Sequence, residues 1–412
     1  MQSSSSSSSQ QTAPAGVPLL DLGRQYAVIQ QQVQAAIARV CSSGRFVLGP
    51  DCEQLEQTLA TYCGAAYGIG CASGSDALLL ALMALDIGPG DEVLCPSFTF
   101  FATASAVARL GARPVFVDID PDTFNMDPRH TAACVSSATK AIIPVHLFGQ
   151  CAEMEAIRSI ARQHHLAVIE DAAQAIGAEY RGIRAGALGE MACLSFYPTK
   201  NLGGFGDGGL LTTNDARLAA KLKLLRGHGM EPRYYHQLVG INSRLDSIQA
   251  AVLNVKMPYL EQWTHARITN AARYTELLTE AKLDRVLRLP VTAPDRRHVW
   301  NQYTIRVPDG RRDALRAHLA AQKIGSEIYY PLGLHQQQCF TYLGYGPGSL
   351  PETERAAAET VALPMFAELT ASEQATVVKS IADFFGVAPT TGHERVARPK
   401  FLDLPTGVRR EA

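Results

Sequence analysis

The chain has 412 residues, of which 47% are hydrophobic and 19% charged, as in ordinary globular proteins with a large core. Its 38 Lys and Arg residues nearly balance its 39 Asp and Glu residues, so the formal net charge is −1. This balance argues against a nucleic-acid-binding or membrane-surface protein, which would carry a basic excess. No run of residues approaches the roughly 18 apolar residues that cross a bilayer, so we expect no membrane partner.

The serine-rich start of the chain contains no Lys or Arg before Arg24 and no apolar segment, so a secretory signal is not expected. The nine cysteines are odd in number and form no C-x-x-C pair, which argues against a disulfide framework and a zinc site. We therefore expect reduced thiols, no bound metal and a cytoplasmic location. By composition, residues 1–16 should be a disordered tail and residues 388–412 a flexible one.

Between the tails, short apolar runs typical of strands alternate with helical patterns. After a helix near 26–41, the expected strands are 67–72, 92–95, 115–117, 141–147, 167–169, 192–197 and 209–213. The expected helices among them are 77–85, 102–110, 153–165 and 215–226. This alternation predicts an α/β fold with a mainly parallel sheet that helices cover on both faces.

A long helical pattern over 260–280 then leads into a part of the chain with fewer strand-like runs. The expected elements there are strands at 300–307 and 327–330 and helices at 311–322 and 372–385. We therefore predict a large α/β domain over 17–262, which includes the N-terminal helix, and a small α+β domain over 263–387. We expect the N-terminal helix to pack on the small domain.

The segment Ser73-Gly74-Ser75-Asp76 follows the first strand and opens an apolar helix. Ser and Asp are good N-cap residues, and the free N–H groups of a first helical turn attract anions. The segment is therefore either an ordinary capped helix or a cradle for a phosphate group.

Two carboxylates, Glu170 and Asp171, end the expected strand at 167–169. Ligands of open α/β sheets bind at this carboxyl edge. Asp171 could bind a metal, cap a helix or hold a cation, and no cluster of His, Asp and Glu with metal spacing surrounds it. A carboxylate that faces a protonated pyridine nitrogen is one of these possibilities.

Lys200 follows a strand and a Pro-Thr turn and precedes a glycine-rich stretch, which is unusual for a solvated surface lysine. Lysine is the side chain that forms Schiff bases with carbonyl compounds. The stretch Gly204 to Gly209 matches the dinucleotide pattern G-x-G-x-x-G, but a strand follows it where that motif requires a helix. Flexible backbone beside a reactive lysine is the better interpretation.

Together these motifs resemble the DegT/DnrJ/StrS family of pyridoxal phosphate (PLP)-dependent nucleotide-sugar aminotransferases, over about residues 18–387. The motifs occur in the following order: Ser73–Asp76, Gly88–Val93, Pro96–Phe100, Pro114–Asp118, Glu170–Gln174, Ser195–Lys200 and Asn242–Arg244. Within the family, the members that aminate C3 of 3-keto sugars are the most similar. The resemblance implies PLP fold-type I, as in aspartate aminotransferase, with a mixed, mainly parallel seven-stranded sheet.

Carried over residue by residue, the resemblance implies that Lys200 holds PLP covalently and moves the substrate proton. Asp171 would pair with the pyridine nitrogen and keep the ring an electron sink. Gln174 would bond the 3-oxygen of the cofactor, and Phe100 would stack on its ring where relatives often have Trp or Tyr.

The resemblance also implies a phosphate site made by Ser75, Asp76 and the Ser195 hydroxyl. Asn242 would reach the phosphate in the neighbouring subunit, so the active sites of a homodimer would be shared. The reaction implied is transfer of an amino group, from glutamate, to a keto nucleotide-sugar.

The substrate side is implied more loosely. Arg244 would meet a diphosphate or a sugar carboxylate, unless it forms a structural ion pair, and Phe46 would line the site entrance. Tyr329, Tyr330 and His335 lie in a segment that contacts the sugar nucleotide in relatives. Similar enzymes for uronic-acid sugars have His-Tyr at the position of Tyr329-Tyr330, which argues against a uronate substrate. A lone His146 after a strand is interpreted as a packing residue.

Two alternatives keep the same fold. A sugar dehydratase that uses pyridoxamine phosphate (PMP) would replace the lysine at position 200 by histidine, which this chain does not. A non-catalytic regulator would be indicated by loss of the lysine or the acid, and both are present.

Overall fold

The computed structural model describes residues 16–387, so nearly all of both expected tails lies outside the described residues. The helices are α1 (Leu22–Ser43), α2 (Pro50–Cys63), α3 (Gly74–Ala84), α4 (Ala102–Arg109), α5 (Pro128–Ala133), α6 (Met154–His164), α7 (Ala216–Leu225), α8 (Ser247–Lys256), α9 (Leu260–Glu280), α10 (Arg312–Ala321), α11 (Pro351–Glu359) and α12 (Ala371–Phe385). The strands are β1 (Tyr67–Cys71), β2 (Glu92–Pro96), β3 (Arg113–Val117), β4 (Thr139–Ile142), β5 (Ala167–Asp171), β6 (Glu179–Tyr180), β7 (Ile183–Arg184), β8 (Met191–Ser195), β9 (Gly209–Thr213), β10 (Arg296–Arg297), β11 (Tyr303–Arg306) and β12 (Thr360–Leu363).

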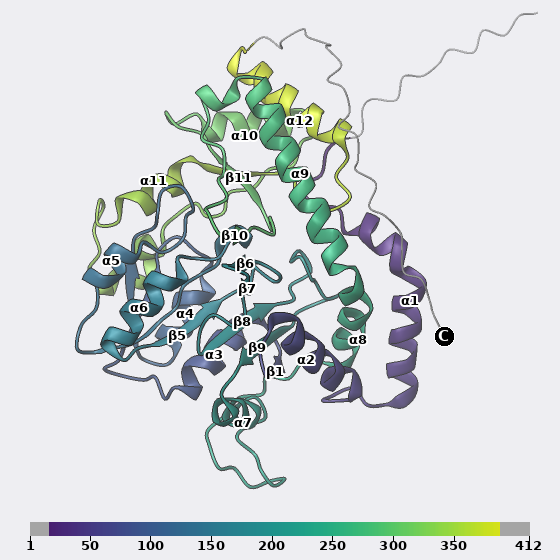
Figure 1. Ribbon diagram of the computed structural model, residues 1–412, viewed down its shortest axis with the longest axis vertical. Coiled ribbons are helices and arrows are strands. Elements are labelled where there is room, and N and C mark those ends of the chain that lie inside the picture. Colours follow the sequence, from purple (N-terminus) through teal and green to yellow (C-terminus); the bar gives the residue numbers. More distant parts are fainter. Residues whose placement is uncertain (1–15, 388–412) are drawn as a thin grey trace, which may run out of the picture.

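A seven-stranded sheet forms the centre of the molecule, with the strand order β1-β9-β8-β5-β4-β2-β3 (Figure 1). The contacts from β8 through β5, β4 and β2 to β3 are all parallel. Only β9 runs against its neighbours, because it pairs antiparallel with both β1 and β8. The predicted α/β fold with a mainly parallel mixed sheet is confirmed.

The strands form this sheet because their side chains alternate between two apolar cores, with the period of two that a strand imposes. Val168 and Leu210 face a core shared with α2, α6 and α8. Their neighbours Ile169 and Leu211 face a core shared with α3, α4 and α7. Helices therefore cover both faces of the sheet, and its polar carboxyl edge is left for a site.

A third core lies away from the sheet, between α9, α10, α12 and the antiparallel pair β11 and β12 (Figure 1). Tyr274 of α9 and Tyr303 of β11 are fully buried in it, with ring centroids 5.1 Å apart. The helix α9 has the predicted bounds, and it runs from the first core, at Leu260, to the third, at Ala271. The proposed boundary between residues 262 and 263 falls within the first turn of this helix.

The expected packing of the first helix is wrong for most of its length. Ile29 and Val33 of α1 pack against Val252 of α8, in the part of the chain predicted to be the large domain. Only the first turn of α1 reaches the third core, where Arg24 pairs with Glu373 of α12. Sequence periodicity identifies an apolar helical face but not the surface that covers it.

Two expected strands are shorter than predicted. In the run 141–147 the regular strand β4 ends at Ile142, because Pro144 has no N–H to donate. A single bridge between Val145 and Asp171 of β5 follows, and residues Leu147–Gly149 then form a turn of 3-10 helix. The run 327–330 makes a single bridge, between Glu327 and Ala362 of β12, before it turns toward the site. The helices α2, α5, α8 and α11 were not predicted.

Candidate active site

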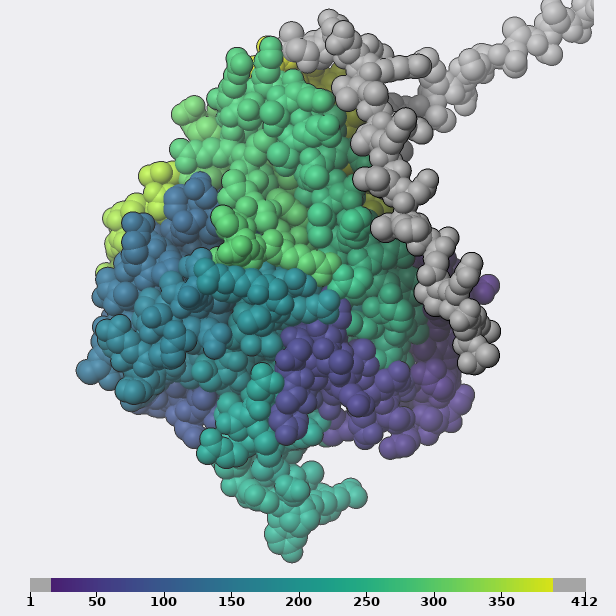
Figure 2. All heavy atoms as spheres, viewed as in Figure 1, coloured from purple at the N-terminus to yellow at the C-terminus, as the bar shows by residue number. Residues whose placement is uncertain are grey.

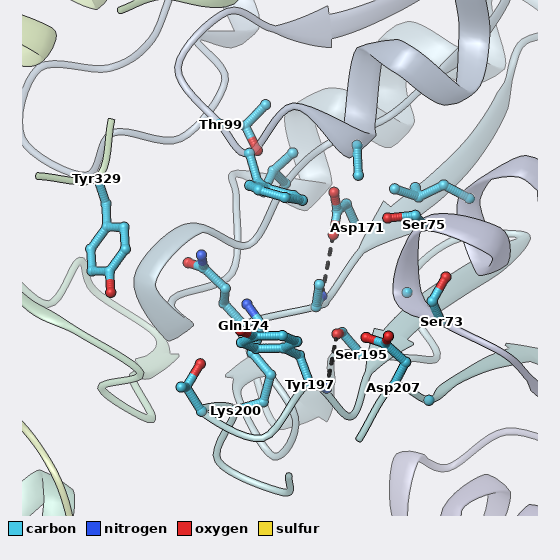
Figure 3. A pocket seen from close by; sticks show the side chains of 18 of the residues that line it. Ser73, Ser75, Thr99, Asp171, Gln174, Ser195, Tyr197, Lys200, Asp207 and Tyr329 are labelled. Carbon is cyan, nitrogen blue, oxygen red and sulfur yellow. Dashed lines mark hydrogen bonds between the residues drawn. The ribbon is translucent and has the colours of Figure 1, made fainter. Parts of the chain in front are cut away.

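A cavity of about 600 Å³ opens at the carboxyl edge of the sheet (Figure 3). Predicted site residues from five separate parts of the chain line it: Ser75, Phe100, Asp171, Gln174, Ser195, Lys200, Tyr329 and Tyr330. The sheet brings these parts together, since β5 and β8 are parallel neighbours and end at the same edge. The volume is within the range of small-ligand and cofactor sites.

Lys200 extends into the cavity from the turn that follows β8. Its own N–H donates to the Tyr197 carbonyl at 2.9 Å, which closes this turn. Burial lowers the pKa of Lys200 to about 8, although the carboxylate of Asp171 opposes that change. An ordinary lysine has a pKa of about 10.4, so a much larger share of this side chain is the nucleophilic free amine at neutral pH.

Asp171 ends β5 and is almost fully buried at the base of the cavity. Its Oδ2 accepts a hydrogen bond from Thr103 Oγ1 at 2.8 Å, and its Oδ1 accepts one from the Ala173 N–H at 3.2 Å. Burial raises the pKa of this carboxyl, and these two hydrogen bonds and Lys200 act in the opposite direction. A buried carboxylate with so few partners is suited to a cationic group of a ligand.

The beginning of α3 forms one wall of the cavity, close to Ser195 (Figure 3). Ser73 caps the helix, because its Oγ accepts the Asp76 N–H at 3.1 Å. Glycine is needed here for close approach: a Cβ on Gly74 would lie 2.7 Å from the Ser195 Cβ, and one on Gly209 would lie 2.4 Å from the Ser73 carbonyl oxygen. First-turn N–H groups beside a serine hydroxyl make a suitable cradle for a phosphate.

The opposite wall of the cavity is formed by the amide of Gln174 and by aromatic side chains. Gln174 Oε1 accepts the Phe148 N–H at 2.7 Å, and its Nε2 donates to Tyr330 Oη at 3.2 Å. These bonds fix the amide orientation and leave the second Nε2 hydrogen for a ligand. Phe100 is 56% exposed, with its ring centroid 6.2 Å from that of Tyr330, so its face is available for contact.

The remaining predicted residues do not line this cavity. Asp76 lies in the first turn of α3, and Phe46 and Asn242 are exposed on the surface. Arg244 follows two residues after Asn242 and is partly exposed. The structure of one chain therefore does not bring Phe46, Asn242 and Arg244 to its own site.

His335 is also absent from the cavity wall, because it is buried beneath it. Its Nδ1 lies 2.7 Å from Ser97 Oγ, and its Nε2 lies 3.2 Å from Glu354 Oε1. The Leu334 N–H donates to the Ser97 carbonyl at 2.7 Å. His335 thus ties the segment that carries Tyr330 to the segment that carries Phe100, and it offers no group to the cavity.

Several lining residues were not predicted as site residues: Ser73, Thr99, Tyr197, Thr199, Asp207 and Gln302. Their positions inside or beside the quoted motifs could have indicated all of them except Gln302. That residue directly precedes β11, and its Oε1 is buried without a hydrogen-bond partner within the described chain. Only the tertiary structure places it beside the lysine.

The second strand-end carboxylate, Glu170, faces away from the cavity. It accepts hydrogen bonds from the N–H groups of Gly186, Leu188 and Gly189, and its Oε2 lies 2.9 Å from His146 Nε2. Both side chains are fully buried. The packing interpretation of His146 agrees with this geometry, and Glu170 holds the loop that precedes β8.

Over residues 16–387, no group of His, Cys, Asp and Glu side chains is arranged to hold a metal ion. In the same residues, no helix is both long and apolar enough to span a membrane. All nine cysteines fall within this range and none is paired in a disulfide.

Comparison with known proteins identifies the family of the chain. A model of the DegT/DnrJ/EryC1/StrS aminotransferase family matches residues 27–382. A "Pleiotropic regulatory protein" of Geobacillus stearothermophilus is 54% identical, over 90% of this chain and 98% of its own. A UDP-N-acetyl-3-dehydro-alpha-D-glucosamine 3-aminotransferase of Acidithiobacillus ferrooxidans is 43% identical, over 90% of this chain and 98% of its own.

Among solved structures, that of DesV from Streptomyces venezuelae, in complex with a ketimine intermediate, superposes with a TM-score of 0.87. The two sequences are 42% identical, and the match covers 90% of this chain and 99% of that one. The family model and these relatives each span most of the described residues, including every motif at the cavity. The chain therefore belongs to the DegT/DnrJ/EryC1/StrS aminotransferase family.

Proposed function

We propose that the protein is a PLP-dependent aminotransferase that moves an amino group from glutamate to a keto nucleotide-sugar, at C3 of a dTDP- or UDP-linked 3-keto hexose, in amino-sugar biosynthesis. The observation that carries the proposal is that Lys200 and Asp171 line one cavity together with the start of α3. The names of two relatives support the substrate class. The Acidithiobacillus ferrooxidans protein is named as a 3-aminotransferase of a 3-dehydro sugar linked to UDP, and a Streptomyces venezuelae protein is named as a dTDP-3-amino-3,4,6-trideoxy-alpha-D-glucose transaminase.

The residues present fit PLP. The first turn of α3 and Ser195 would hold its phosphate, Asp171 its ring nitrogen, Gln174 its 3-oxygen, and Phe100 the face of its ring. When bound, PLP supplies an electron sink for the pair of electrons left when the substrate loses a proton. The cavity at this edge has the size and the complementary groups for each part of the cofactor.

The protein's own groups then do the rest. Lys200 would attach the cofactor and, once displaced by the substrate amine, would move one proton between two carbon atoms, that of the substrate and C4′ of the cofactor, which lie on either side of the transferred nitrogen. Its pKa of about 8 allows the amine both to accept and to return that proton near neutral pH. Asp171 would remain ionised and keep the ring nitrogen protonated.

We propose that two copies of the chain form the working enzyme. The arm, defined as residues 227–243, leaves α7 and projects from the body of the molecule (Figures 1 and 2). Residues 231–239 are all exposed, among them Tyr234, Tyr235 and Val239. So much exposed apolar surface next to Asn242 is typical of a protein contact. A second copy would take Asn242 to the phosphate, with Arg244 and Phe46 at the substrate entrance.

Mixed dimers test this arrangement. In a dimer of Lys200→Ala and Asn242→Ala chains, one site combines an intact Lys200 with an intact Asn242 and the other has neither. Purified heterodimers, separated by two affinity tags, should therefore recover about half of the wild-type turnover, well above either parent, as two-fold symmetry requires. Heterodimers no more active than their parents would show that each chain completes its own site.

For the substrate, we propose that Tyr329 and Tyr330 contact the sugar in the cavity, where the structure places them. His335 acts there only by positioning this segment, because Ser97 and Glu354 occupy its ring nitrogens. The cytoplasm is the proposed location, since the free cysteines are typical of a reducing compartment.

A non-catalytic regulator is the second candidate, and the name of the 54% identical relative favours it. The presence of Lys200 and Asp171 in one cavity supports catalysis instead, because a regulator needs neither the reactive amine nor the buried acid. The PMP-dependent dehydratase remains the less favoured enzyme, because position 200 is lysine.

The deciding experiment incubates the purified protein with PLP, glutamate and a panel of dTDP- and UDP-linked 3-keto and 4-keto sugars. Mass spectrometry should show one sugar that exchanges its keto oxygen for an amino group, with formation of 2-oxoglutarate. Conversion of 4-keto sugars alone would contradict the C3 assignment. Failure with every sugar, together with binding of a nucleotide sugar or DNA, would favour the regulator.

A further inference from the structure

The loop that follows Lys200, residues 201–206, is held from one side by a pair of asparagines. Asn201 Nδ2 donates to the Val299 carbonyl at 3.0 Å, and Asn201 Oδ1 accepts from Asn301 Nδ2 at 2.8 Å. All three residues are buried, so water does not compete for these bonds. This side of the loop is anchored to the segment that precedes β11.

The helix α8 holds the other side of the same loop with two side chains. Gln249 Oε1 accepts the Phe205 N–H at 2.7 Å, and Lys256 Nζ donates to the Gly203 carbonyl at 2.7 Å. The helix is itself packed between α1 and α2, and its residues belong to three apolar clusters. It therefore provides a rigid support for the loop.

Gly203 packs directly against the turn that contains Lys200. A Cβ on Gly203 would lie 2.2 Å from the Pro198 carbonyl oxygen, so the loop folds back against that turn without a gap. The Gly204 N–H also donates to the Phe196 carbonyl at 2.7 Å. If the Gly203 carbonyl is free to move, the Tyr197–Lys200 turn is free to move with it.

Lys256 is an unusual residue for a purely structural bond. It is only 3% exposed, and no carboxylate of residues 16–387 lies within ion-pair distance of its Nζ. Its contacts are the Gly203 carbonyl and the face of Phe205, whose centroid is 5.1 Å away. Phe205 in turn meets Tyr26 of α1 edge-on at 5.5 Å. Burial lowers the pKa of Lys256 to about 8, although the charge of Glu368 opposes that change, which is the sign of an ammonium held at a cost.

We propose that Lys256 is a positioning residue for the reaction: its ammonium fixes the Gly203 carbonyl and thereby holds the Lys200 amine in its buried place in the cavity. Gln249 of α8 and the edge-on contact of Phe205 with Tyr26 of α1 complete this support. The proposal rests on the proposed function only in taking Lys200 as the reacting amine.

The test is the reactivity of Lys200 itself in full-length protein stripped of cofactor. An amine-acylating reagent is applied across a pH series, and mass spectrometry of the Lys200 peptide gives the midpoint of its labelling. Wild type should have a midpoint near 8. Lys256→Met retains the length of the side chain but loses the donor, so Lys200 should gain access to water and its midpoint should rise by about one pH unit toward that of a free lysine.

Lys256→Gln retains a donor and should give a smaller rise in the midpoint. The matched control is Lys221→Met, since Lys221 of α7 pairs with Asp86 at the surface. In this control the labelling midpoint of Lys200 should stay near 8. In the loaded enzyme, Lys256→Met should lower kcat about tenfold and change the KM for the keto sugar less than twofold.

A Lys256→Met protein that loses thermal stability but keeps the wild-type labelling midpoint would overturn the proposal, because Lys256 would then be structural only. If that variant does not fold, the midpoint of Lys256→Gln decides in the same way. Absence of aminotransferase activity in wild type would refute the proposed function and leave the labelling result standing, so the two failures are distinguishable.

Discussion

Replacing Lys200 with alanine is expected to lower turnover by at least about 10³-fold, because both cofactor attachment and proton transfer depend on its amine. Borohydride treatment of the wild-type protein with PLP, followed by peptide mapping, should place the pyridoxyl mass on Lys200. The Lys200→Ala protein should carry no such modification and should lose the visible absorbance of lysine-bound PLP. Without PLP, its melting temperature should equal or exceed that of cofactor-free wild type, since a buried amine with a pKa near 8 is costly to hold.

Lys221→Ala is the matched control, because it removes a lysine that forms a surface ion pair away from the cavity. It should keep full turnover and the modification at Lys200. A Lys200→Ala protein that retains the absorbance unchanged would mean that another lysine carries the cofactor, and the assignment of the site would be wrong.

Replacing Asp171 with asparagine should leave PLP bound but reduce kcat by about 10²- to 10³-fold. An amide has the shape of the carboxylate and can keep the bond to Thr103, but it carries no negative charge to stabilise a protonated ring nitrogen. Cofactor occupancy by absorbance and kcat under saturating glutamate are the two measurements. Near-normal turnover at full occupancy would remove Asp171 from this role.

The neighbouring residue provides the contrast. Glu170→Gln alters a buried carboxylate that accepts three backbone N–H bonds and contacts His146, all outside the cavity. Its loss should cost about 2–4 kcal/mol of unfolding free energy, as for other buried charges deprived of their pairing. The turnover of the molecules that remain folded should be close to wild type. The two adjacent carboxylates are thus expected to have different roles: Asp171 affects the turnover rate and Glu170 the free energy of unfolding.

The sequence alone was sufficient for the main features of the fold. Strand alternation predicted the parallel sheet, because residues such as Val168 and Ile169 must face opposite cores whatever the details of packing. The helix α9 has the bounds that its pattern predicted. The parts that failed are those whose partners lie far along the chain, among them α2, α8 and the surface that covers α1.

The sequence by itself also determined the chemical types at the site, since Lys200, Asp171 and Ser75 stand in motifs whose local geometry, a strand end or a helix start, places them at the sheet edge. Only the tertiary structure showed that Gln302 joins their cavity, that His335 lies beneath it, and that Lys256 supports the loop after Lys200. The physical reason is range: a local motif sets the conformation of a few consecutive residues. Burial, by contrast, is set by segments that meet only when the whole chain has folded. The pKa of an amine and the hydrogen-bond partner of a carbonyl depend on that burial and on those segments.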